Sequence, residues 1–578
     1  MQDDPSTPPE SKQPSLPPQG PDPGAALPGQ APVEGGFLGF VERLGNLLPD
    51  PVTLFVIGTV VVMILSAVAV GNDWAVTKML PEVVTQVDET GVSAPVLDEE
   101  GRPTTEWRVQ YTQDGEPEQL VARSLLTGDG LFWTLQNMVK NFINFAPLGV
   151  VLVGMLGIGV AERVGLIAAL LKAFMMVVPR ALLTPAMVFL GVMSSAGIDA
   201  GYVVLPPLAA ALYKAAGRAP LAGLAAVFAG VAAGFNANLM VTGLDPMLAG
   251  FATIGAQVLD PEYAVNPACN LYFMIASTFV ITLVGWWVTA RFVEPRLEKK
   301  SPEEGGPTTI GADDLESQRI QEREGAALKV AAGLLAGLVG LFALAYQMPG
   351  WALYGKGALF ERWAEAIVPM LFLLFLVPAI GFGVVMGKIK GDKGLAKLFV
   401  DSIAAMAPII VLAFFAAQFI EYFKYSGLDK MLALWGGQTL GQIDMPSWML
   451  VVSFIGITMV FNLFIGSMSA KYALFAPIFI PMFMLVGISP ELTQAAYRIG
   501  DSVTNSITPL NPYVIVILVF MQRFVPRGGL GTLISTMLPY SIAFAVVWTV
   551  MIVGWMLLGL DLGQDGGLTY DATALSGR

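Results

Sequence analysis

Two acidic residues and one lysine interrupt stretches that are otherwise apolar. Asp199 lies in "SSAGIDAGYVVLPP", Lys471 in "GSMSAKYALFAP" and Asp501 in "RIGDSVTN". If a helix that begins at Pro490 is continuous, Asp501 lies about 16 Å along it, near the middle of a hydrocarbon core about 30 Å thick. A charge at that depth is costly unless it is paired or hydrated. We therefore expect Asp199 and Asp501 to carry the coupling charge, and Lys471 to neutralise Asp501 or bind a substrate carboxylate.

Each of these residues also has a structural interpretation that the sequence leaves open. Asp501 would form an ion pair with Arg498, three residues earlier on the same helix face. Asp199 would cap a helix end in a hairpin turn. Lys471 would extend its ammonium to the membrane surface.

Neutral side-chain oxygens gather near the same apolar breaks. One group is Ser194, Ser195, Asn236 and Asn238, and the other is Ser467, Ser469, Thr504, Asn505 and Thr508. Such oxygens, with carbonyls freed at helix breaks, suit a hard cation such as sodium. The predicted sodium ligands are Ser194, Ser195, Asn238, Ser467, Ser469, Thr504 and Asn505, and Asn236, Asn238 and Asn505 are also predicted substrate contacts. Helix capping explains any single one of them equally well.

The composition places the elements that carry these residues in a membrane. Of 578 residues, 55% are hydrophobic and only 13% are charged, whereas soluble proteins carry roughly a quarter charged residues. Many apolar runs approach the ~20 residues that a spanning helix needs. We therefore predict an all-α polytopic membrane protein.

The charged and reactive residue types narrow the function further. A net charge of −13 argues against a nucleic-acid partner. The single cysteine, Cys269, excludes an internal disulfide and a cysteine metal cluster. Because the chain has no histidine, a proton-handling role would fall on Asp, Glu, Lys or Tyr.

The order of apolar and charged segments predicts nine spanning helices and two re-entrant helical hairpins. Lysine and arginine in the short loops place the N-terminus in the cytoplasm and the acidic C-terminal tail outside. The predicted segments are a disordered cytoplasmic tail (1–35), the first transmembrane helix with an extracytoplasmic loop (36–131), repeat 1 (132–293) with hairpin 1 (182–216), a cytoplasmic loop (294–327), two connecting helices (328–387), repeat 2 (388–560) with hairpin 2 (448–486) and the last helix, and an extracytoplasmic tail (561–578).

Two parts of the chain, repeat 1 and repeat 2, are similar to each other. Aligning Tyr202 with Tyr472 also aligns Pro207 with Pro477, Gly217 with Gly487 and Pro220 with Pro490. The predicted topology makes hairpin 1 enter from the cytoplasm and hairpin 2 from outside, so the repeats are inverted. Inverted repeats with interrupted helices at mid-membrane are typical of secondary transporters with alternating access.

The two hairpin regions, "SSAGIDAGYVVLPPLAAALYKAAGRAP" and "GSMSAKYALFAPIFIPMFMLVGISPELTQAAYRIGDSVTNSITPLNPY", closely resemble the p-aminobenzoyl-glutamate transporter (AbgT) family. The likeness extends from about Phe37 to Leu560. It implies a homodimer in a bacterial inner membrane that moves p-aminobenzoyl-glutamate or exports sulfonamide antimetabolites, driven by an ion gradient. The family's acidic positions match Asp199 and Asp501, its functional proline matches Pro490, and Trp448 is the candidate for its tryptophan.

Other functions remain open from the residues themselves. The hairpin serines loosely resemble the motifs of divalent anion/sodium symporters, so a sodium-coupled dicarboxylate symporter is the alternative. An intramembrane aspartyl protease would need Gly-x-Gly-Asp, but Arg498 stands where its first glycine is required. A passive channel is less consistent with an inverted repeat. "GMLGIG" (154–159) lacks the strand and the Lys-Ser/Thr of a phosphate-binding loop.

Overall fold

The computed structural model describes residues 50–87, 93–96, 105–197, 200–307, 320–443, 445–511, 513–526 and 528–575. The tail predicted over residues 1–35 lies outside the described residues, and so does Asp199.

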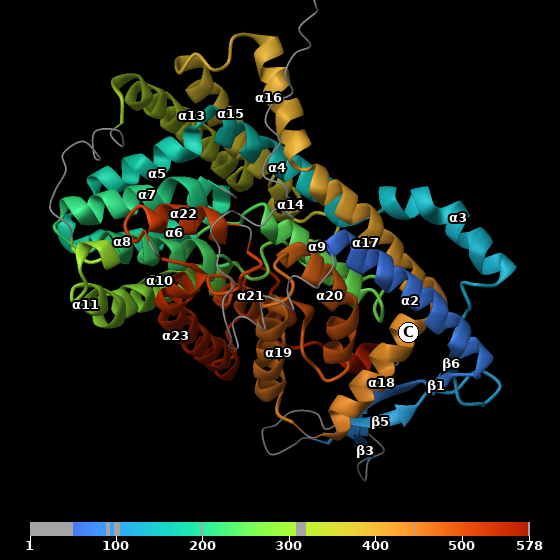
Figure 1. The fold of residues 1–578 in the computed structure, drawn as a ribbon. Coiled ribbons are helices and arrows are strands. Elements are labelled where there is room, and N and C mark those ends of the chain that lie inside the picture. Colours follow the sequence, from blue (N-terminus) through green and yellow to red (C-terminus); the bar gives the residue numbers. More distant parts are fainter. Residues whose placement is uncertain are drawn as a thin grey trace, which may run out of the picture.

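The chain is mainly helical, with long helices packed side by side (Figure 1). The first part contains α2 (Pro51–Gly71), α3 (Gly128–Ile143), α4 (Ala146–Val164), α5 (Leu166–Val177), α6 (Leu183–Met193), α7 (Ala200–Ala215), α8 (Pro220–Phe228) with the π-turn η3 (Ala229–Ala233), α9 (Leu244–Ala256), α10 (Leu271–Val288) with the π-turn η4 (Thr289–Val293), and α11 (Glu294–Leu297). The second part contains α13 (Glu322–Gln347), α14 (Arg362–Glu365), α15 (Ile367–Val385), α16 (Asp392–Ala405), α17 (Ala407–Ser426), α18 (Leu428–Gln442), α19 (Ser447–Asn462), α20 (Met468–Met484), α21 (Pro490–Val503), α22 (Val514–Gln522) and α23 (Leu530–Leu557).

Seven helical stretches among the described residues are long and apolar enough to cross a membrane. They are 51–71, 128–164, 271–297, 322–347, 367–385, 407–426 and 530–557. Five apolar helices are shorter, including α6, α19 and α20. The protein is therefore multi-pass, as its composition predicts.

The prediction of an all-α chain needs one correction, in the loop before α3. Three short antiparallel pairs form there: β1 (Ala75–Thr77) with β6 (Gln119–Val121), β2 (Met79–Val83) with β5 (Thr105–Val109), and β3 (Thr85–Val87) with β4 (Ser93–Pro95). Valine, threonine and tryptophan in these segments favour a pleated backbone. Figure 1 shows the strands beside α18, and Leu80 of β2 packs against Leu434 of that helix.

The order of elements recurs in the two halves. The series α4, α5, α6, α7, α8, α9, α10 is matched by α17, α18, α19, α20, α21, α22, α23. Glycines with positive φ occupy the same joints: Gly165 and Gly427 follow the first helix of each series, and Gly217 and Gly487 precede the prolines that begin α8 and α21. Only glycine adopts this backbone conformation without strain. The helices α6–α7 and α19–α20 occupy the residues for which hairpins 1 and 2 are predicted.

Candidate functional site

The most polar helix of the second half is α21, and all its residues are buried. Ser489 caps it by accepting a hydrogen bond from the Leu492 N–H at 3.0 Å, and Pro490 follows at the first helical position. At the opposite end of α21, Asp501 lies against Asn462, the last residue of α19, and against Lys471 near the start of α20.

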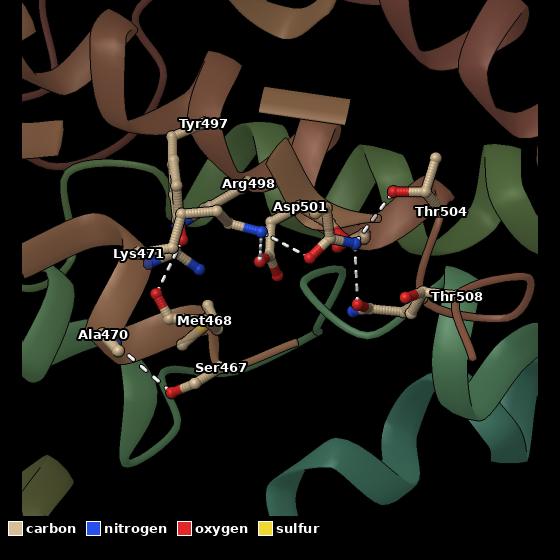
Figure 2. A network of polar contacts seen from close by, with 12 residues as sticks. Ser467, Met468, Ala470, Lys471, Tyr497, Arg498, Asp501, Thr504 and Thr508 are labelled. Atoms are coloured by element: carbon tan, nitrogen blue, oxygen red, sulfur yellow. Dashed lines mark hydrogen bonds and ion pairs between the residues drawn. The ribbon is translucent and has the colours of Figure 1, made fainter. Parts of the chain in front are cut away.

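Lys471 and Asp501 form an ion pair that is removed from solvent. The Lys471 Nζ lies 2.8 Å from the Asp501 Oδ1, and the two side chains are 0% and 1% exposed. Figure 2 shows them facing each other, with Tyr497 above the lysine. The interpretation in which Lys471 extends to the membrane surface is therefore wrong. Each charge is compensated by the other, as buried charges require.

Asn462, the last residue of α19, connects this pair to the break after α21. Its Oδ1 accepts a hydrogen bond from Lys471. Its Nδ2 donates to the Asp501 carbonyl at 2.6 Å, the Thr504 hydroxyl at 2.8 Å and the Asn505 Oδ1 at 2.9 Å. One amide thus binds three groups at the end of α21 and holds the hairpin 2 tip against it.

Repeat 1 contributes a residue to the same site, Asn236, from the segment between η3 and α9. The Asn236 Nδ2 donates to the Ser502 hydroxyl at 2.8 Å and to the Asp501 Oδ2 at 3.3 Å. Since Asn236 comes from one repeat and Asp501 from the other, the charged centre is shared between them.

A second buried ion pair also joins the two repeats. An Arg498 guanidinium nitrogen lies 2.5 Å from the Asp245 Oδ1, and the two side chains are buried. Asp245 also accepts hydrogen bonds from the Thr242 N–H and hydroxyl at 2.6 and 2.8 Å. Arg498 therefore pairs with Asp245 across the repeats and not with Asp501 on its own helix.

Breaking this second pair is expected to destabilise the fold strongly. Arg498→Met leaves the Asp245 carboxylate buried without its partner, which typically costs about 3–5 kcal/mol. Thermal unfolding of the detergent-solubilised protein would show a lowered Tm. The Tm of the double variant Arg498→Met/Asp245→Asn should return most of the way to the wild-type value, because no unpaired charge remains. Equal Tm values for the single variant and the wild type would contradict this.

The predicted sodium ligands fall into three groups in space. Thr504 and Asn505 lie at Asn462, as described. The Ser194 hydroxyl donates to the Gly191 carbonyl, and the Ser195 hydroxyl lies 2.8 Å from the Val192 carbonyl and 2.9 Å from the Asn238 Oδ1, which share its one proton. At hairpin 2 the Ser467 hydroxyl accepts from the Ala470 N–H at 3.3 Å, as a helix cap, and lies 3.4 Å from the Ser469 hydroxyl.

Trp448, the candidate for the family's tryptophan, is 40% exposed and lies at the beginning of α19, about 21 Å from Asn462 at the other end of that helix.

Thr508 donates to the Leu463 carbonyl at 3.2 Å and so fixes the loop after α21 to hairpin 2.

A cavity of about 520 Å³ lies between α3, α9, α17 and the segment before α15. Its lining combines the apolar Phe145, Phe360 and Ile420 with the charged Glu365, Glu421 and Lys424. Backbone N–H groups of Leu359 and Phe360 donate to Glu365 and lower the pKa of its carboxyl, so this wall stays negative.

Aromatic rings extend from the cavity to the ion pair. Ring centroids lie 5.8 Å apart for Phe145 and Phe251, 6.3 Å for Phe251 and Tyr472, and 4.2 Å for Tyr472 and Tyr497. The Lys471 Nζ lies 5.7 Å from the Tyr497 ring centroid. Within the described part of the chain, the buried Tyr472 hydroxyl has no hydrogen-bond partner.

Sequence reasoning missed Asn462, Asp245 and Ser502. Two features of the sequence could have pointed to these residues. Asn462 follows a long apolar run, and Asp245 stands in "TGLDP", which aligns with "TPLNP" of the other repeat. The pairing of Asp245 with Arg498 had no signal, since it joins residues 253 positions apart.

Comparisons with known proteins agree with this architecture. The AbgT putative transporter family matches residues 36–570. The p-aminobenzoyl-glutamate transport protein of Escherichia coli K12 is 33% identical over 535 residues, which cover 92% of this chain and 96% of the relative.

Two solved structures are similar along nearly the whole chain. The YdaH transporter of Alcanivorax borkumensis is 37% identical, with a TM-score of 0.76, and the match covers 89% of this chain and 100% of that one. MtrF of Neisseria gonorrhoeae, from a class of antimetabolite efflux pumps, is 38% identical, with a TM-score of 0.76 and coverage of 90% and 97%. The chain belongs to the AbgT transporter family.

Proposed function

We propose that this protein is a secondary active transporter that moves p-aminobenzoyl-glutamate and related p-aminobenzoate-like compounds or sulfonamide antimetabolites, with export as the direction. The observation that carries the proposal is the buried Lys471–Asp501 pair shared between the repeats through Asn236. A charge whose partners come from two repeats changes its environment when one repeat moves against the other. The names of the relatives support the substrate class.

The ion pair supplies a simple coupling mechanism. Protonation of Asp501, or a cation in place of the Lys471 ammonium, frees that ammonium to bind a substrate carboxylate. Oxygens of Asp501, Thr504 and Asn505 around Asn462 have the chemistry that sodium prefers. The coupling ion in this proposal is a proton or sodium, and Asp199 is a second carrier in the hairpin 1 turn.

The cavity and the aromatic rings are the proposed substrate path. The cavity's volume of about 520 Å³ falls within the ~300–1,000 Å³ typical of small-molecule sites. The benzoyl ring would stack along Phe145, Phe251 and Tyr472, and the unpartnered Tyr472 hydroxyl would bind a polar substrate group.

The proposed arrangement in the cell has nine spanning helices and two hairpins in each subunit of a homodimer. The protein lies in a bacterial inner membrane, with a cytoplasmic N-terminus and a periplasmic C-terminus. Loop charges and the resemblance to the family support this orientation.

The experiment is uptake of labelled p-aminobenzoyl-glutamate by proteoliposomes, with proton and sodium gradients imposed separately. We expect one gradient to raise accumulation about tenfold over vesicles without a gradient. Protein-free vesicles and the Asp501→Asn variant are the controls. No stimulation by either gradient would refute coupled transport. Competition by succinate but not by sulfonamides would instead favour the dicarboxylate symporter.

A further inference from the structure

Glu491, in the first turn of α21, is a buried carboxyl that neither ion pair uses. It is 2% exposed. Each of its carboxyl oxygens lies 3.1 Å from the Tyr263 hydroxyl. Among the described residues, no lysine or arginine nitrogen lies within 4.0 Å of it.

The charges along α21 leave Glu491 without compensation. Asp501 is neutralised by Lys471, and Arg498 by Asp245. Arg498 follows Glu491 by two helical turns, about 10 Å along the axis. The partners of its carboxyl are all neutral: the Tyr263 phenol, the Ser489 hydroxyl and its own backbone N–H. A buried carboxylate without a positive partner is unfavourable relative to the neutral acid. Burial in this conformation therefore favours the protonated form of Glu491.

The C-terminal segment 562–570 lies against the start of α21, next to this acid. The Ser489 hydroxyl donates to the Gly567 carbonyl at 2.6 Å. The Ser489 N–H donates to the Leu568 carbonyl at 3.2 Å, and the Tyr570 N–H donates to the Gly487 carbonyl at 3.0 Å. The segment is also held by the Phe273 N–H, which donates to the Leu562 carbonyl at 2.9 Å, by the Gln564 N–H, which donates to the Ala268 carbonyl at 3.1 Å, and by the Asn266 Nδ2, which donates to the Asp565 Oδ2 at 2.8 Å. Because none of these hydrogen bonds lies within a helix, the segment can detach without unfolding one.

We propose that Glu491 is a proton-binding site that couples proton movement to transport. The inference rests on the proposed transport function and assigns its coupling ion. The carboxyl takes a proton from water when segment 562–570 detaches. Its O–H bond breaks, and the proton returns to water, when α21 moves away from Tyr263 in the opposite conformation.

The groups around Glu491 do not supply a competing charge of opposite sign. From the neighbouring elements, the titratable groups that face it are Tyr263 and Cys269 between α9 and α10, Tyr472 of α20, Asp565 and Tyr570 of the C-terminal segment, and Arg498 of its own helix. Asp565 adds negative charge and further favours the protonated acid. Arg498 is held by Asp245.

The test compares Glu491→Gln with Glu491→Asp and with Glu116→Gln, an exposed glutamate as the matched control, in proteoliposomes without sodium. We expect Glu491→Gln to lower proton-driven accumulation of p-aminobenzoyl-glutamate at least about tenfold. Glu491→Asp retains a carboxyl and should remain coupled, and Glu116→Gln should behave as wild type. Coupled accumulation by Glu491→Gln would overturn the inference. Wild-type transport driven by sodium alone would also overturn it, while the proposed function would stand.

A second measurement does not depend on transport. Infrared spectra of the purified full-length protein at neutral pH should contain a carboxylic-acid C=O band that Glu491→Gln lacks. Its absence from the wild type would overturn the inference even if no substrate were moved.

Discussion

Asp501→Asn is expected to reduce gradient-driven transport about 100-fold or more, because it removes the only negative charge bonded to Lys471 among the described residues. The buried ammonium would then face only neutral groups: the Asn462 oxygen, the Tyr497 ring and the new amide. Removing one partner of a buried pair typically costs about 3–5 kcal/mol. We therefore expect a lower Tm together with the loss of flux. Proteoliposome uptake and thermal unfolding measure the two effects.

A double variant separates the stability effect from the transport effect. Lys471→Met/Asp501→Asn has no buried charge left at this site, so its Tm should recover most of the loss while transport stays abolished. Asp114→Asn, at an exposed turn position, is the matched control and should change neither quantity. Gradient-driven transport by the double variant would show that the pair is structural and that coupling occurs elsewhere.

The repeat and its breaks could be predicted from the sequence because they depend on local chemistry. Glycine at positive φ and proline at a helix start are constraints on single residues, and Gly217–Pro220 and Gly487–Pro490 occupy the same joints. Asp501 could be singled out because a carboxylate in an apolar chain is costly wherever it lies. Asn462 is neutral, so the energy argument that singled out Asp501 did not apply to it.

The partners of these residues could not be predicted in the same way. Arg498 has an acidic neighbour, Asp501, within one helical turn, but in the structure it pairs with Asp245 of the other repeat. Ser194, Ser195 and Ser467 had the right atoms for a cation, yet their hydroxyls bond nearby backbone groups. Both outcomes depend on how helices from distant parts of the chain pack. The spacing of nearby residues carries no information about that packing.

A disulfide between positions 488 and 569 is expected to stop transport reversibly. Ile488 and Thr569 face each other in an antiparallel bridge. The flanking hydrogen bonds, from Ser489 to Leu568 and from Tyr570 to Gly487, make them a non-hydrogen-bonded pair. Such pairs have Cα atoms about 4.5 Å apart, within the range that disulfides span. Locking this pair fixes the base of hairpin 2 to the C-terminal segment.

The variant Ile488→Cys/Thr569→Cys is best made with Cys269→Ala, which removes the single native cysteine. Oxidation should lower gradient-driven uptake about tenfold or more, and a thiol reductant should restore it. The cost of replacing buried Ile488 is the same in both redox states, so each sample is its own control. The oxidant should not change gradient-driven uptake by either single-cysteine variant. If the oxidised protein transports as fast as the reduced one, hairpin 2 and the C-terminal segment move as one body, and access to Glu491 must open elsewhere.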